Sequence, residues 1–250
     1  MIERIQQYIG TGLSLHLWNA LIEFATAMIV GFVLKYFLWE EGTSQATSIG
    51  ASKLITKSLS LEGFSEIVVN GISSVNVYRG DNYLVKISAP EDEVDNVKGE
   101  KNGTTLSLDF ISDLKSSTGP KPITVEIMLP EVSTVHIQRA TKIDLSGLKI
   151  NSLFITAKGV VKVTGNDAMI HDLKFNNSGT TSIDLSSIPI TNAELECQGV
   201  YSIVIMMNGG RLAGNIGGIG SFDYKGNVSV NELRINGSQN NMAYQHPVNP

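Results

Sequence analysis

From residue 59 onward, apolar and polar residues alternate in short runs along the chain. The clearest runs are 67–69, 75–77, 84–87, 106–108 and 123–127. A period of two places every second side chain on one face, which is typical of strands with one buried face. Turn-forming residues separate the runs at 79–82, 101–103 and 116–120, and no long helical pattern intervenes. The pattern therefore predicts an all-β domain over residues 59–242.

In the second half, the alternation repeats about every twenty residues. One column of the repeat is Gly159, Gly179, Gly199 and Gly218, spaced by 20, 20 and 19. A second column is Ile143, Val163, Ile183, Ile203 and Phe222, and a third is Leu153, Leu173, Ala193, Leu212 and Leu233. This period is too short for a propeller blade and suits one coil of a parallel β-helix. We expect like residues to stack between coils, with positive φ at the corner glycines.

Two side chains of the repeat have a predicted place inside the coil. Cys197 falls on the same inward parity as Leu195, which indicates a small core residue rather than a nucleophile. Asn177 has the same parity and is expected in a ladder of asparagines at a turn.

Near the N-terminus, residues 13–39 are mostly apolar and contain no proline. The stretch 17–39 has 23 residues, about the length that crosses roughly 30 Å of hydrocarbon as a helix. The sequence therefore predicts a hydrophobic helix over 13–39 that anchors the chain in a membrane.

Four residues are predicted to set how this helix sits in the bilayer. Lys35 lies near one end, where it can extend toward water, and Tyr36 and Trp39 are the expected interfacial anchors. Glu23 lies inside the other end and is expected to face a partner helix or the headgroup layer.

Two other interpretations of the segment stay open. A cleaved signal peptide would find a small-residue site at 44–46, although its n-region would be long, with Arg4 as the only side-chain cation. A soluble capping helix would explain the charges within the run. For an anchor, Arg4 before the span, with Glu40 and Glu41 after it, favours a cytoplasmic N-terminus. The expected organisation is then a short segment (1–12), the helix (13–39), a linker (40–58), the β-helix (59–242) and a polar tail (243–250).

The composition excludes several classes of function and of binding site. The net charge is −5, from 19 basic and 24 acidic residues, which excludes a basic nucleic-acid binder. A single cysteine excludes a disulfide scaffold and a cysteine-based zinc site, and the 4 histidines are isolated from one another. We therefore expect no metal site, no cofactor and no nucleic-acid partner.

Outward-facing charges on the second strand of each coil are the candidates for interaction or catalysis. They are Lys142, Asp144, Lys162, Asp184 and Asp223. A glycosidase needs two carboxylates about 5–10 Å apart, and a lyase needs clustered acids that hold calcium beside a base. Asp144 and Asp184 are expected two coils apart, about 10 Å, with Thr164 between them and no Arg or His beside them. The pattern favours an exposed interaction wall of mixed charge and no catalytic residue.

Of two other acidic groups, the first is predicted to be solvated and the second offers at most a weak calcium site. Glu194 and Glu196 lie on the outward face of the other wall. The acidic turn at 91–95 lacks the spacing of a calcium loop.

Three segments of the chain also resemble a known family. Residues 64–110, FSEIVVNGISSVNVYRGDNYLVKISAPEDEVDNVKGEKNGTTLSLDF, are similar to the start of the "putative auto-transporter adhesin, head GIN domain" family. Residues 123–147 resemble its strand, proline, strand and small-residue turn, and the coils to residue 237 resemble its repeating core. The resemblance implies a single-stranded right-handed parallel β-helix in the bacterial envelope, with an adhesin role. Many relatives carry a lipoprotein signal, whereas this chain has a helix and no cysteine near its N-terminus.

Three functional hypotheses follow. The favoured one is a non-enzymatic β-helix, anchored in the inner membrane, that acts as an adhesin-like or structural interaction module in the periplasm or outside the cell. It would bind a protein or glycan through its exposed sheets and form homo-oligomers; secretion after signal cleavage is the alternative location. The second is a carbohydrate-active lyase or glycosidase that uses Asp144, Asp184 or Asp223. The third is a subunit of a larger envelope assembly, in which Glu23 contacts other membrane helices.

Overall fold

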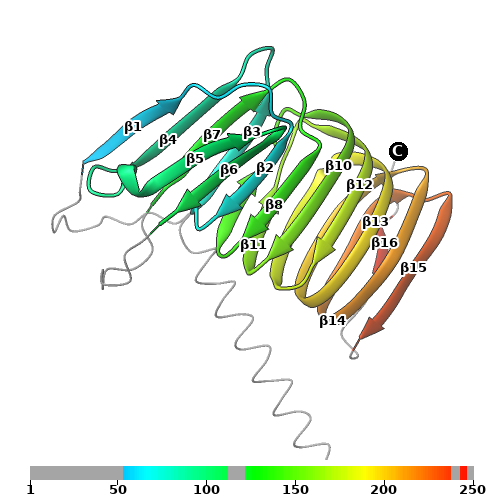
Figure 1. The fold of residues 1–250 in the computed structure, drawn as a ribbon. Helices are drawn as coiled ribbons and strands as arrows, with labels where there is room; N and C mark the ends of the chain where they lie inside the picture. Colours follow the sequence, from blue (N-terminus) through cyan, green and yellow to red (C-terminus); the bar gives the residue numbers. More distant parts are fainter. Residues whose placement is uncertain (1–52, 112–121, 238–242, 247–250) are drawn as a thin grey trace, which may run out of the picture. The chain divides into compact units, whose positions relative to one another are not determined.

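A computed structural model describes residues 53–111, 122–237 and 243–246, which are almost entirely β-structure (Figure 1). Residues 52–250 make up one compact unit of the chain. Its first elements are β1 (Leu54–Leu59), β2 (Glu66–Asn70), β3 (Ser74–Arg79), β4 (Leu84–Pro90), the 3-10 helix η2 (Val94–Asn96), β5 (Val97–Asn102), β6 (Thr105–Phe110) and β7 (Thr124–Leu129). They are followed by β8 (Thr134–Gln138), β9 (Thr141–Asp144), β10 (Lys149–Lys158), β11 (Val160–Thr164), β12 (Met169–Asn177), β13 (Thr180–Asn208), β14 (Arg211–Asn227), β15 (Val230–Gly237) and β16 (Ala243–His246).

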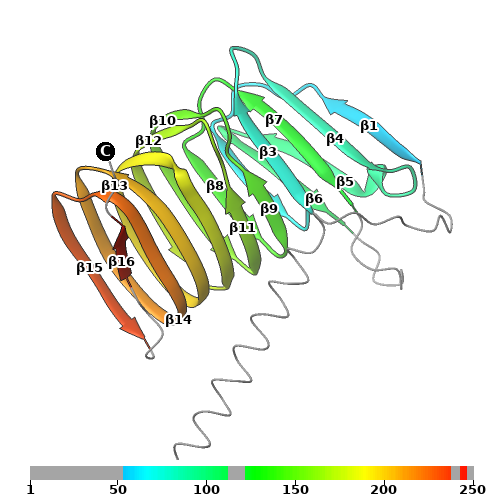
Figure 2. The same ribbon diagram turned by 180° about the vertical axis from the view of Figure 1, so that it is seen from behind.

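Parallel strands stack into two walls that enclose the core (Figures 1 and 2). Wall 1 consists of β6, β2, β8, β10, β12, residues 190–197 of β13, residues 211–218 of β14, and β15. Wall 2 consists of β7, β3, β9, β11, residues 180–184 and 200–208 of β13, residues 219–227 of β14, and β16. The chain alternates between the walls for about five turns. The predicted all-β solenoid of stacked coils is thus confirmed.

Strand register confirms most of the repeat. Leu153 lies opposite Leu173, which lies opposite Ala193, and Ala193 lies opposite Leu212. The predicted alignment of Leu212 with Leu233 is wrong. Leu212 lies opposite Asn231, and Leu233 lies opposite Gly214. The final coil is therefore 19 residues long rather than 21. Both alignments keep the same inward parity, so alternation alone could not distinguish them.

The corner glycines are required by a close approach of neighbouring coils. Gly159 and Gly218 have positive φ (104° and 99°), as predicted, but Gly179 does not. At Gly179, Gly199 and Gly218, an added Cβ would overlap the carbonyl oxygen of the preceding glycine in the column. Those carbonyls accept the next coil's hydrogen bonds, from Thr180 N to Gly159 O at 2.8 Å for instance. Positive φ, the predicted reason for glycine at these corners, therefore explains only some of the glycines in the column.

The N-terminal end departs from the parallel pattern. β4 pairs antiparallel with β1 and β7, and β5 pairs antiparallel with β6. A parallel pair needs a crossover of a dozen or more residues, whereas only residues 103 and 104 separate β5 from β6. β1 also begins inside the predicted linker (40–58), so residues 54–58 are strand rather than tether. Ile55 and Leu59 explain the difference, because both pack against the core.

Inward side chains of both walls form one continuous hydrophobic core. Cys197 is fully buried there, as predicted, and burial raises the pKa of its thiol to about 12. Asn177 is also buried, but the predicted asparagine ladder is wrong because its neighbours in the column are Ala157 and Cys197. Asn177 Oδ1 instead accepts hydrogen bonds from Gly179 N at 3.0 Å and Thr181 Oγ1 at 2.6 Å. Asn177 therefore links the end of β12 to the start of β13 at the corner of this coil.

Candidate functional site

The predicted interaction residues lie on the outer face of wall 2. Asp144 and Asp184 both lie opposite Thr164 on the intervening coil, and Val204 separates Asp184 from Asp223. Lys142 and Lys162 lie side by side in a neighbouring column. The structure therefore brings these residues onto one wall but keeps each carboxylate at least two coils, about 10 Å, from the next.

Local hydrogen bonds occupy two of these carboxylates. Asp144 accepts hydrogen bonds from Ser146 N and Thr164 Oγ1, both at 3.0 Å. Asp184 accepts from Ser186 N at 3.2 Å and Ser186 Oγ at 2.7 Å. The contacts with Ser146 and Ser186 stay within the chain segment that carries each aspartate, and the contact with Thr164 joins adjacent coils. They do not assemble a facing acid pair of the kind that glycosidases use.

Other sequence-predicted candidates lie in residues 13–39 and in the acidic turn at 91–95. Glu23, Lys35, Tyr36 and Trp39 lie outside the described residues. Over residues 53–111, 122–237 and 243–246, the structure has no helix of the length and apolarity that a membrane crossing requires. In the acidic turn, Glu93 is nearly buried and accepts a hydrogen bond from Asn96 Nδ2 at 2.8 Å. The same described ranges hold no cluster of His, Cys, Asp or Glu fit to bind a metal.

Wall 1 carries a denser set of polar contacts on its outer face. Lys174 Nζ donates to Glu194 Oε1 at 2.9 Å, and Asn215 Nδ2 donates to Glu196 Oε1 at 2.9 Å. Each pair joins equal positions of adjacent coils, which lie about 4.8 Å apart in a sheet. The outer face is therefore a ladder of paired charges and amides.

A shallow groove of about 650 Å³ opens at the C-terminal end of this ladder. Ala213 and Gly214 line it together with longer polar side chains. Ala213 lies in register between Glu194 and Glu232, so a methyl group stands between two long carboxylate side chains on neighbouring strands. A small residue in the middle strand thus leaves the hollow, and Arg234 also lines it.

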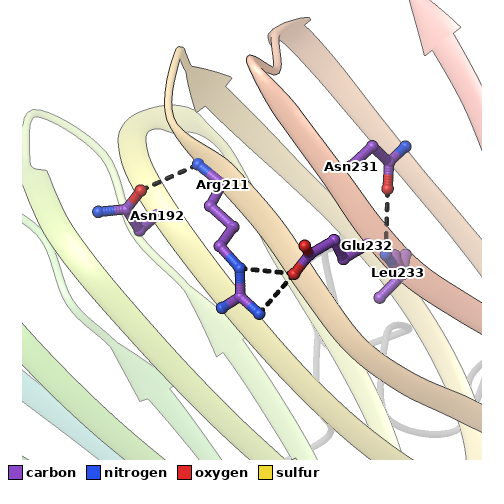
Figure 3. A network of polar contacts seen from close by, with 5 residues as sticks. All are labelled: Asn192, Arg211, Asn231, Glu232 and Leu233. Carbon is purple, nitrogen blue, oxygen red and sulfur yellow. Dashed lines mark hydrogen bonds and ion pairs between the residues drawn. The ribbon is translucent and has the colours of Figure 1, made fainter.

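A network around Arg211 fixes one side of the groove (Figure 3). Arg211 Nη2 and Nε lie 2.7 and 2.9 Å from Glu232 Oε2, and the Arg211 backbone N–H donates to Asn192 Oδ1 at 2.9 Å. Asn192 also donates to Asp172 Oδ1 at 2.8 Å. That bond, followed by a hydrogen bond from His171, lowers the pKa of the Asp172 carboxyl. The network joins four successive coils and preorganises this side of the groove.

An aromatic pair lies on the same outer face. The rings of His136 and Phe154 meet edge to face, with centroids 5.9 Å apart. Phe154 is in register with Lys174, which is in register with Glu194, so the pair lies in line with the ladder. Phe154 lies two coils from Glu194, outside the lining of the groove, and offers an apolar surface beside the ladder.

The sequence pattern predicts that Glu194 and Glu196 are solvated and does not indicate the groove. The sequence does contain a sign of the groove. At one outward position of three successive coils, a small residue, Ala213, lies between Glu194 and Glu232. It could be found only once the 19-residue length of the last coil was known.

Comparison with known proteins supports this architecture. A family model described as "Putative auto-transporter adhesin, head GIN domain" matches residues 63–249. The crystal structure of a "putative adhesin" from Bacteroides fragilis is 16% identical, with a TM-score of 0.56, over 79% of this chain and 98% of that chain. A "putative lipid binding protein" from Parabacteroides distasonis is also 16% identical, with a TM-score of 0.48, over 80% and 98% of the two chains. No curated protein matches this chain significantly. The likeness to the Bacteroides fragilis structure shows a shared fold.

Proposed function

Because this chain belongs to the "Putative auto-transporter adhesin, head GIN domain" family, we propose that it is a non-enzymatic, adhesin-like protein of the bacterial cell envelope. Residues 13–39 anchor it in the inner membrane, and the solenoid lies in the periplasm or outside the cell. The apolar length of 13–39 and the charges around it support this placement. A single-stranded, right-handed coil is part of the proposal and rests on the family resemblance.

The groove on wall 1 is the observation that carries the binding role. Its carboxylates are already paired, Glu194 with Lys174, Glu196 with Asn215, and Glu232 with Arg211. Such a surface offers many hydrogen-bond donors and acceptors but little net charge, which suits an uncharged ligand with many hydroxyl groups. We therefore assign the ligand to neutral glycans, whose apolar ring faces can also pack on Phe154.

The arrangement of acids supports binding rather than hydrolysis. On wall 2, Asp144 and Asp184 each accept a hydrogen bond from the backbone N–H two residues further along the chain, and one coil lies between them. On wall 1, Glu194 and Glu232 flank Ala213, but each has a cationic partner on its own side. These ion pairs support a structural role for both carboxylates. We expect no new reducing ends when the protein is incubated with the glycans that it binds.

Calorimetric titration of the full chain in detergent micelles with chitohexaose and cellohexaose tests the binding role. Wild type is expected to bind at least one of them, and Glu194→Gln to weaken binding about tenfold by removing a charged hydrogen-bond acceptor. Asp184→Asn is the matched control on wall 2 and should bind as wild type does. Equal weakening by Asp184→Asn would favour the predicted wall of Lys142, Asp144, Lys162, Asp184 and Asp223. If the protein binds neither glycan, the glycan assignment is wrong. The adhesin role would still stand in that case if the protein attaches to cells.

Fractionation of cells that express a C-terminally tagged full chain tests the location. The tagged chain is expected in the inner-membrane fraction at full length, with its solenoid digested by protease once the outer membrane is opened. A shortened, soluble form would instead show a cleaved signal peptide. Extraction only as part of a larger complex would favour an envelope assembly over a separate adhesin.

A further inference from the structure

The last strand of wall 1 leaves an open edge. Within the described part of the chain, β15 pairs with β14 alone. Val230 N donates to Gly210 O at 3.1 Å, so Val230, and by alternation Glu232 and Arg234, direct their backbone groups toward β14. The backbone N–H and C=O groups of Asn231, Leu233 and Ile235 then point away from β14, toward the open edge of the sheet. An open edge of this kind is a template for another strand.

The charges on β15 are complementary to the same strand turned around. Glu232 and Arg234 lie two residues apart on the outer face. In an antiparallel pair centred on Leu233, Glu232 lies opposite the partner's Arg234, and Arg234 lies opposite the partner's Glu232. A pair centred on Glu232 or on Arg234 would place like charges opposite each other. We infer that β15 pairs antiparallel with β15 of a second copy of this chain, with Leu233 on the twofold axis.

Backbone geometry agrees with this register. Leu233 and the partner's Leu233 would form a hydrogen-bonded pair, because both direct their N–H and C=O groups to the edge. Glu232 and the partner's Arg234 would then form a non-hydrogen-bonded pair, in which Cα atoms approach to about 4.5 Å and side chains are closest. Arg234 has no ion pair within the described residues, so its guanidinium is available for the partner's Glu232.

Apolar surface at the end of the core adds to the interface. Leu233 and Ile235 are only partly buried there, and Val230, on the outer face, is 45% exposed. In the single copy, Asn231 Oδ1 accepts the Leu233 N–H at 3.1 Å (Figure 3). Pairing exchanges this bond for one to the partner's Leu233, so the dimer is reversible rather than permanent.

Pairing would also extend the candidate binding face. In an antiparallel pair, the twofold axis is perpendicular to the sheet, so the outer faces of both copies of wall 1 point the same way. The partner's Arg234 would reach Glu232 at the rim of the groove, and the two grooves would lie on one continuous sheet. If the glycan role proposed above holds, two linked sites would raise the affinity for a long chain.

Sedimentation velocity of the full chain in detergent tests the pairing. Wild type is expected to dimerise with rising concentration, whereas Glu232→Arg alone and Arg234→Glu alone each weaken dimerisation about tenfold or more. An equimolar mixture of these two variants should restore the dimer, because each strand then faces opposite charges. Lys174→Glu, on the same face but away from the edge, is the matched control and should dimerise as wild type does. Restoration in the mixture also shows that both variants fold.

Asn231→Ala gives an effect in the opposite direction. It frees the Leu233 N–H, so the dimer should tighten. A wild type that stays monomeric at all concentrations would overturn the inference, as would a dimer that survives both single charge reversals. Neither result bears on the glycan titration, which a monomer can pass.

Discussion

Substitution of Gly179 by alanine separates two reasons for a glycine at the corner of each coil. Gly179 is not one of the glycines with positive φ, so the cost of a left-handed conformation does not apply to an alanine there. If conformation were the only requirement, alanine would stabilise the protein by about 0.4–1 kcal/mol, through a less flexible unfolded chain. If the approach of the neighbouring coil is the requirement, alanine must destabilise it.

The structure gives the expected size of the effect. A Cβ on Gly179 would overlap Gly159 O and would lie 2.6 Å from Gly159 N, both of them backbone atoms that cannot rotate away. Overpacking of this kind costs about 1–3 kcal/mol. Separation of the coils would also strain the hydrogen bond from Thr180 N to Gly159 O, worth about 1 kcal/mol. Gly179→Ala is therefore expected to lower the free energy of unfolding by about 2–4 kcal/mol.

Denaturation by urea, followed by far-ultraviolet circular dichroism, measures the effect. Gly147→Ala is the matched control, because Gly147 has a φ of 73° and no atom within 4 Å of an added Cβ. That control is expected to lose only about 1–2 kcal/mol, the cost of a left-handed conformation. A Gly179→Ala protein as stable as wild type, or more stable, would refute the close-approach argument.

Three further predictions follow from the core and from the network around Asn192. Asn192→Ala should raise the pKa of Asp172 toward its ordinary value, which an NMR titration of the carboxyl would detect; an unchanged pKa would show that Asn192 is not its cause. Because the folded pKa of Asp172 is lowered, its contribution to stability is present above its unfolded pKa of about 3.9 and is lost as pH falls through the folded value. Cys197, with a pKa of about 12, should resist alkylation at pH 8 until the protein unfolds, and rapid labelling of the native protein would contradict its burial. Phe175→Ala should lower the free energy of unfolding by about 3–5 kcal/mol in the same urea assay, and a loss below about 1 kcal/mol would show that the core there is loose.

The sequence was sufficient for the solenoid because its signal is periodic. Columns such as Ile143, Val163 and Ile183 recur at a fixed spacing, and each coil repeats the same environment. The N-terminal end could not be predicted in this way. β1, β4 and β7 occur once each, and alternation does not say whether a strand pairs parallel or antiparallel.

The candidate site was harder to predict than the fold. Glu194 and Glu196 have the same outward alternation as any solvated residue, so their position along the chain does not distinguish a binding face from a soluble surface. The groove depends on which residues lie side by side, and a shift of two residues in the last coil moves Glu232 away from Ala213. Sequence patterns indicate the parity of a strand, whereas a binding face requires its register.

Hydrogen exchange of the full chain, with and without saturating chitohexaose, tests the central claim most directly, because it locates the ligand on the fold. The account predicts slower exchange in peptides that cover residues 190–197, 211–218 and 230–237 of wall 1, and no change in those that cover wall 2. Protection confined to wall 2, or no protection anywhere, would contradict a binding role for this face.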